Sequence, residues 1–153
     1  MSESLAVVVP VYNETAVLEA FHQRLAGVLS ECGMATQVLY VDDGSDADCL
    51  ELLHSLRARD PQVAVLELSR NFGREVALSA GLDHVDADAV VLMDADLQDP
   101  PELIPRFIAE WREGYDVVYG ERIERQGESV LKRFTASAFY RVMGYLSDVE
   151  IPR

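Results

Sequence analysis

Three carboxylates close an apolar run in the stretch VVLMDADLQDP, Val90 to Pro100. The apolar part has the composition of a buried strand, and Asp94, Asp96 and Asp99 follow directly at its end. Removing an isolated carboxylate from water is costly unless a cation or hydrogen-bond donors meet it. A positive partner is therefore expected at this point of the chain.

The spacing of these acids favours a divalent metal site. Asp94 and Asp96 occupy alternate positions, so an extended backbone would point both the same way, and Gln98 adds an amide oxygen. Mg²⁺ or Mn²⁺ suits such oxygens, because these ions take one or two carboxylates and complete their shell with phosphate and water. The alternative is that the acids cap the helix after the two prolines, which explains Asp99 well and Asp96 poorly.

Short β-rich runs alternate with helical patterns along the chain, which predicts an α/β domain with a mostly parallel, Rossmann-like sheet flanked by helices. We interpret residues 1–153 as one such domain. Strands are predicted at Leu5–Val11, Gln37–Val41, Val63–Leu68, Ala89–Met93 and Tyr115–Tyr119. Helices are predicted at Ala16–Ser30, after a Ser45 cap, at Glu75–Val85 and after an Asp99 cap.

Polar residues follow each predicted strand, at the edge where open parallel sheets bind ligands. One polar strand end means little, because Asp, Asn, Gly and Ser also form turns, but five together favour a site. Asp42 is a candidate acceptor for a nucleobase or a ribose hydroxyl, although a turn role is equally open. The polar residues are Tyr12, Asn13 and Glu14, then Asp42 and Asp43, then Ser69, Arg70 and Asn71, then Asp94 and Asp96, then Glu121 and Arg122.

Charge is distributed unevenly along the chain. The formal net charge of -14 argues against nucleic acid as a partner. Up to Glu121 there are 7 basic and 23 acidic residues, whereas from Arg122 onward there are 6 basic and 4 acidic. The stretch Ser129–Leu146 is amphipathic and basic, and a docked surface helix and a membrane-lying helix both remain open for it.

Other classes of site find little support in the sequence. Cys32 and Cys49 lack metal-ligand spacing, and we expect ordinary thiols in a reducing compartment. No apolar run approaches the length of a membrane span, and we expect no signal peptide. Nucleophilic triads, Walker loops and GxGxxG motifs do not occur. A phosphoacceptor receiver module would need its acidic pair after the first strand, which here ends in Tyr12-Asn13-Glu14.

Four motifs resemble those of family 2 glycosyltransferases of the GT-A fold. They are VVVPVYNE at Val7 to Glu14, VDDGS at Val41 to Ser45, SRNFGRE at Ser69 to Glu75, and DADLQDPPELIP at Asp94 to Pro105. The stretch Gly120 to Arg141 is similar to the branch that transfers sugars to polyprenyl phosphates, such as bactoprenol glucosyltransferases and dolichol-phosphate mannose synthases.

The resemblance implies roles for particular residues. Asp94 would face the ribose and diphosphate, and the metal would be held by Asp96 and Gln98, with Asp94 beside them. Arg122 would reach donor or acceptor phosphates and share the catalytic role with the two aspartates, and Lys132 and Arg133 would lie near the lipid phosphate. The nucleotide-binding edge would comprise Pro10, Tyr12, Asn13, Glu14, Asp42 and, with less support, Asp43.

The activity that the resemblance implies is metal-assisted, inverting transfer of a sugar from a nucleotide donor to a polyprenyl phosphate. The cofactors would be Mg²⁺ or Mn²⁺ and a nucleotide-sugar, a UDP-sugar rather than a GDP-sugar. Alternatives are a soluble family 2 transferase acting on a polysaccharide or other hydroxyl acceptor, and a non-catalytic fragment that binds metal or nucleotide. Oligomeric state stays open, a homo-oligomer included.

The same resemblance implies a longer protein. Family members continue past Ile151-Pro152-Arg153 into further acceptor residues, and bactoprenol-type members then add transmembrane helices. We therefore expect a full-length protein at the cytoplasmic face of a membrane, of which this stretch is a soluble, truncated donor-binding portion. We expect it to bind donor and metal but to transfer sugar poorly.

Overall fold

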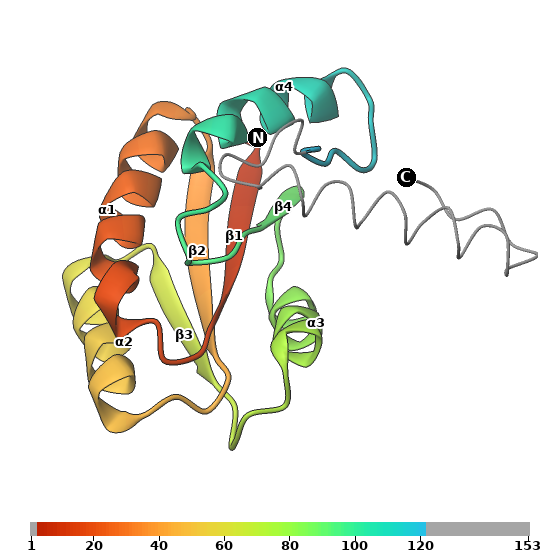
Figure 1. The fold of residues 1–153 in the computed structure, drawn as a ribbon. Helices are drawn as coiled ribbons and strands as arrows, with labels where there is room; N and C mark the ends of the chain where they lie inside the picture. The colour runs from red at the N-terminus through yellow and green to blue at the C-terminus, as the bar shows by residue number, and fades with distance from the viewer. Residues whose placement is uncertain (1–2, 122–153) are drawn as a thin grey trace, which may run out of the picture. The chain divides into compact units, whose positions relative to one another are not determined.

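The computed structural model describes residues 3–121, which contain a four-stranded parallel sheet with helices on both faces (Figure 1). The sheet order is β3-β2-β1-β4, so the first strand lies inside the sheet. The chain divides into a compact unit of Met1–Val118 and a second unit that begins at Tyr119. The strands are β1 (Ser4–Val11), β2 (Ala35–Asp42), β3 (Val63–Glu67) and β4 (Ala89–Leu92), and the helices are α1 (Thr15–Glu31), α2 (Ala47–Arg59), α3 (Arg74–His84), the 3₁₀ helix η1 (Pro101–Leu103) and α4 (Ile104–Arg112).

The apolar run of β1 is buried because both faces of the sheet are covered there. Residues Leu5, Val7 and Val9 pack in one core with side chains of α1, α2 and α4. Val8 points to the opposite face and packs with Ala77 of α3 and its neighbours. In Figure 1, α3 accordingly lies across the sheet from α1 and α2. This double-sided burial confirms the predicted α/β class.

Four predicted strands and the helical pattern are confirmed with shifts of one or two residues at most ends. The buried side of α1 includes Leu18 and Leu29, whereas Val17 and Val28 are only half-buried. The N-cap of α2 is Asp46, whose carboxylate accepts the N–H of Cys49 at 3.0 Å. The prediction of Ser45 as the cap was therefore wrong by one residue.

The predicted fifth strand, Tyr115–Tyr119, is wrong for this structure, since no strand lies there. A strand requires the backbone donors and acceptors of a neighbour, and none of the described strands pairs with this segment. Its alternate apolar side chains also lack a surface to cover, because Tyr115, Val117 and Tyr119 are 59%, 78% and 81% exposed. Alternation alone therefore misled the interpretation.

The segment after the two prolines also differs in detail. Pro101–Leu103 forms a 3₁₀ turn with Pro100 before it, and α4 begins only at Ile104, so Asp99 is not the cap of a regular helix. Glu102 instead makes a two-point ion pair with Arg24 of α1, at 2.8 and 2.9 Å to one guanidinium nitrogen. No helix within residues 3–121 combines the length and the apolar character that crossing a membrane requires.

Candidate functional site

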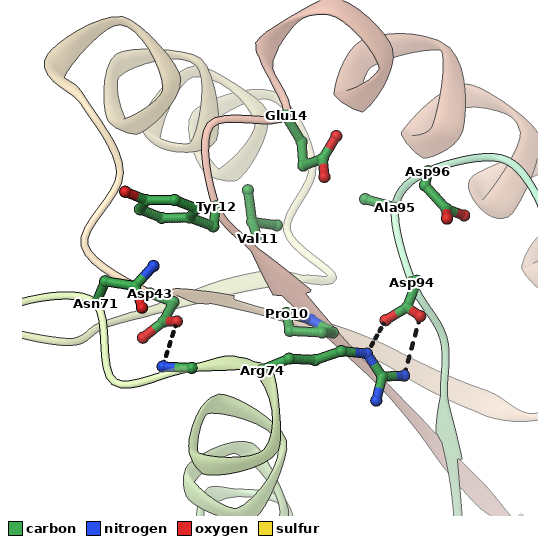
Figure 2. Close-up of a pocket in the computed structure, with 11 residues that line it drawn as sticks. Pro10, Val11, Tyr12, Glu14, Asp43, Asn71, Arg74, Asp94, Ala95 and Asp96 are labelled. Atoms are coloured by element: carbon green, nitrogen blue, oxygen red, sulfur yellow. Dashed lines mark hydrogen bonds and ion pairs between the residues drawn. The ribbon is translucent and has the colours of Figure 1, made fainter.

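A pocket of about 320 Å³ opens at the carboxyl ends of β1 and β4 (Figure 2). Strand ends and the loop before α3 converge on it, as the rule for open parallel sheets predicts. The residues that line it are Pro10, Val11, Tyr12, Glu14, Asp43, Asn71, Gly73, Arg74, Asp94, Ala95 and Asp96.

The structure brings together six of the residues predicted for the site, and these line the pocket: Pro10, Tyr12, Glu14, Asp43, Asp94 and Asp96. Three others lie outside the lining, namely Asn13, Asp42 and Gln98. Arg122, Lys132 and Arg133 fall outside the described residues, so their predicted phosphate contacts stay predictions.

Asn13 connects the end of β1 to the loop after β2. Its backbone N–H donates to Ser45 Oγ at 3.0 Å, and its Oδ1 accepts the N–H of Asp46 at 2.8 Å. Asn13 adopts a positive φ of 57°, a conformation that Asn tolerates better than most residues. Two strand ends are thereby held in one place, so the role visible for Asn13 is structural.

The two acids of the VDDGS motif are both buried, at 3% exposure each. Asp43 accepts the N–H groups of Phe72 and Gly73 at 2.7 and 2.9 Å, so both of its oxygens hold the loop that precedes α3. Asp42 accepts the N–H of Ser45 in a long contact of 3.2 to 3.3 Å. Asp43 thus holds in place the loop that contributes Gly73 to the pocket lining.

Arg74, the first residue of α3, reaches across the pocket to Asp94 (Figure 2). Its Nε and Nη2 donate to the two carboxylate oxygens of Asp94 at 2.8 and 2.9 Å, and its Nη1 donates to Glu75 at 2.8 Å. The hydrogen bonds that Arg74 donates to Asp94, more than any other cause, raise the pKa of its guanidinium above the ordinary value. The positive partner expected for this acidic stretch is therefore at least in part a side chain.

Asp96 lies in a turn rather than in extended backbone, because β4 ends at Leu92. It is exposed, and its Oδ1 accepts the N–H of Gln98 at 2.9 Å. The next residue, Leu97, has a positive φ of 61°. The turn, and not the alternation of a strand, brings Asp96 to the same pocket as Asp94.

The donor set fits a divalent metal that also takes ligands from a substrate. Within residues 3–121 no three His, Cys, Asp or Glu side chains cluster closely enough to form a metal site by themselves. Two pocket-lining carboxylates, Asp94 and Asp96, are nevertheless what Mg²⁺ or Mn²⁺ uses when phosphate oxygens and water complete its shell.

Asn71, which was predicted among the polar residues at the strand ends, lines the pocket, and so does Arg74, for which a phosphate contact and an ordinary surface position were equally open. The SRNFGRE motif carried the signal, since it follows β3 and opens α3. Its arginines looked equally compatible with an ordinary surface. In the structure Arg70 stacks on Phe72, with the guanidinium carbon 4.0 Å from the ring centroid, and Arg74 alone enters the pocket lining.

Comparison with known proteins identifies the family to which the sequence belongs. The model of the glycosyl transferase family 2 matches residues 6–149. An uncharacterized glycosyltransferase of Bacillus subtilis is 44% identical over 147 residues, covering 96% of this chain and 46% of that protein. The bactoprenol glucosyl transferase of Shigella phage SfX is 38% identical over 147 residues, again 96% of this chain and 48% of the other. The chain spans about half the length of these relatives.

Solved structures agree on the fold. A mannosyltransferase from Pyrobaculum calidifontis, in complex with GDP-Man and Mn²⁺, superposes with a TM-score of 0.58 at 22% identity, over 71% of this chain and 32% of that one. Staphylococcus aureus TarS superposes with a TM-score of 0.56 at 21% identity, over 80% and 38%. The sheet order, the acidic pocket and the family match lead to one conclusion: the chain is a GT-A-type member of glycosyl transferase family 2.

Proposed function

We propose that the protein transfers a sugar, with inversion, from a nucleotide-diphosphate donor to a polyprenyl phosphate. The observation that carries this proposal is the acidic pocket with Asp94 and Asp96 at the carboxyl ends of β1 and β4. The choice of acceptor is supported by the similarity to bactoprenol glucosyl transferases at 37–38% identity. We propose a UDP-sugar as the donor, as the resemblance of the sequence to the bactoprenol branch implies.

The donor nucleotide would lie along the edge formed by β1 and β2. Tyr12 is 49% exposed beside the pocket and offers an aromatic face, while Pro10 and Glu14 line the same wall. Asp42 remains our candidate for a base or ribose contact, because its carboxylate is already fixed at the end of β2. The diphosphate would face Asp94, Asp96 and Arg74.

Asp94 and Asp96 would hold the divalent cation, with Gln98 nearby in the same turn. When bound, such an ion supplies Lewis-acid neutralisation of the charge that builds on the leaving diphosphate. The chain itself contributes the geometry. Arg74 pairs with the Asp94 carboxylate in the metal-free pocket, and the hydrogen bond from the backbone N–H of Gln98 fixes Asp96.

A phosphate acceptor would need little help from a general base at the reacting oxygen. The second pKa of a phosphate monoester is about 6, so at neutral pH the attacking oxygen is mostly ionised. We assign Arg122, Lys132 and Arg133, in the basic C-terminal part of an otherwise acidic chain, to the phosphates of donor and acceptor. One displacement at the anomeric carbon would give a β-linked product from an α-linked donor, and the acceptor would place the full-length protein at the cytoplasmic membrane face.

Calorimetric titration of UDP, GDP, CDP and ADP, with and without Mn²⁺, tests the donor half. We expect metal-dependent, base-selective binding that Asp96→Asn loses and that the matched control Asp83→Asn, an exposed acid of α3, retains. Equal binding by Asp96→Asn would refute the assigned metal ligand. Selective binding of GDP would show that the donor is a GDP-sugar, and it would leave the assigned metal ligand unchanged.

The acceptor half needs a separate comparison of polyprenyl phosphate with the corresponding polyprenol. With the full-length protein, transfer to the phosphate alone is expected, because only the phosphate is ionised at neutral pH. Transfer to polyprenol or to a polysaccharide hydroxyl would instead support the alternative of a family 2 enzyme with a hydroxyl acceptor. NMR of the anomeric proton of the product decides between inversion and retention.

A further inference from the structure

Arg74 supplies the one positive charge among the described side chains that line the pocket, against four carboxylates. The carboxylates are those of Glu14, Asp43, Asp94 and Asp96. Each of the three guanidinium nitrogens of Arg74 donates a hydrogen bond, Nε and Nη2 to the two oxygens of Asp94 and Nη1 to Glu75. Its positive charge therefore lies directly beside the carboxylate that a metal ion would use.

A divalent cation and Arg74 cannot share Asp94 on equal terms. Both carboxylate oxygens already accept guanidinium hydrogen bonds at 2.8 and 2.9 Å. A cation that approached them would also be repelled by the guanidinium at short range, where Coulomb energies are largest. The pairing with Arg74 therefore opposes the binding of a metal to Asp94, and release of the Arg74 side chain would remove that opposition.

A displaced Arg74 would find a suitable new partner in a diphosphate. The guanidinium is planar and presents paired N–H donors that match phosphate oxygens as well as they match a carboxylate. Its side chain is about half exposed, so it has room to turn within the pocket.

We propose that Arg74 is a positioning residue that exchanges partners, pairing with Asp94 in the metal-free pocket and with the donor diphosphate once a divalent cation takes Asp94. The diphosphate half rests on the proposed function, whereas the metal half does not. The exchange makes metal and nucleotide bind cooperatively, because Arg74 opposes the metal alone and favours the two together.

The Arg74→Gln variant separates the two halves of this proposal. Binding of Mn²⁺ without nucleotide, followed by electron paramagnetic resonance, is expected to tighten about tenfold, because a competing charge has been removed. Calorimetric binding of UDP or GDP at saturating Mn²⁺ is expected to weaken about tenfold, because a charge-assisted phosphate contact is lost. Opposite shifts are diagnostic, since general damage to the pocket would weaken both.

Three further variants serve as controls. Arg59→Gln removes an equal charge from a similar two-point ion pair, with Glu19, outside the pocket lining, and should leave both affinities unchanged. Arg74→Lys keeps the positive charge but lacks the paired N–H donors of the guanidinium. Mn²⁺ affinity should therefore stay near that of the parent protein, while diphosphate affinity falls. In an Asp94→Asn background, Arg74→Gln should no longer tighten Mn²⁺ binding.

Each outcome decides one half. Mn²⁺ affinity that is unchanged, weaker or undetectable in folded Arg74→Gln overturns the metal half, with folding verified by circular dichroism. Undiminished diphosphate affinity overturns the partner exchange. If the parent protein binds no nucleotide at all, the proposed function and the diphosphate half fail together, and the Mn²⁺ titration still decides the metal half.

Discussion

The buried carboxylate of Asp43 holds Gly73, accepting its backbone N–H at 2.9 Å while the other oxygen accepts that of Phe72 at 2.7 Å. The two residues are 30 positions apart in sequence, and their contact fixes the loop that delivers Arg74 to the pocket. Asp43 thus acts on the site through backbone geometry.

Asp43→Asn should destabilise the fold by roughly 1–3 kcal/mol, because an amide group would face a buried N–H that needs an acceptor. The free energy of unfolding in urea measures this directly. Asp46→Asn is the matched control, since Asn caps a helix as well as Asp does, and little change is expected. Equal effects of the two substitutions would contradict the role given to Asp43.

Gly44 lies directly under the loop that Asp43 holds. Its φ is 76°, and an added Cβ would lie 2.5 Å from the carbonyl carbon of Arg70. Backbone atoms at that distance cannot yield as a flexible side chain would, so overpacking adds to the conformational cost. Gly44→Ala should therefore cost about 3 kcal/mol or more in unfolding free energy.

Gly33 provides the comparison for that substitution. It has a similar φ of 67°, but open space surrounds the position of its Cβ. Gly33→Ala should cost only about 1–2 kcal/mol, the conformational part alone. A cost for Gly44→Ala no larger than that for Gly33→Ala would show that the loop can move off Gly44.

Asn13 tests whether a motif residue acts on the ligand or on the fold. Asn13→Ala removes the acceptor for the N–H of Asp46 and should cost about 1 kcal/mol in unfolding free energy. Asn13→Asp keeps an acceptor and should preserve both stability and nucleotide affinity. Loss of nucleotide affinity in a stable Asn13→Asp protein would instead support direct contact with the donor.

His22 should make stability depend on pH. It is 8% exposed, its Nδ1 lies 3.0 Å from Tyr40 Oη, and burial lowers its pKa below the ordinary 6.5. Asp60 and Glu19 oppose this shift and Arg59 adds to it. His22 therefore binds its proton more tightly in the unfolded chain than in the folded protein. The free energy of unfolding is unaffected by His22 above about pH 6.5, and it decreases as the pH falls from there toward the pKa of His22 in the folded protein.

Urea unfolding between pH 8 and pH 5 measures that dependence. His22→Gln keeps a polar partner for Tyr40 and should flatten the profile below pH 6.5 relative to the parent protein. Identical profiles for the parent and His22→Gln would refute the assignment.

The amino-acid sequence by itself determined the fold class and the edge of the sheet at which the site lies. The alternation of strands and helices implies parallel pairing, and parallel strands bring their carboxyl ends to one edge. Pro10, Tyr12, Glu14, Asp94 and Asp96 could therefore be placed together before any coordinates, and they do line one pocket.

Only the tertiary structure decided how those residues are held. The pairing of Arg74 with Asp94 spans 20 positions and depends on where α3 begins relative to β4. Asp43 turned out to hold a backbone loop, and Tyr115–Tyr119 formed no strand despite its alternation. The local sequence pattern indicates whether a residue is buried or exposed. The residue that it contacts belongs to a segment distant in sequence, and the local pattern does not identify that segment.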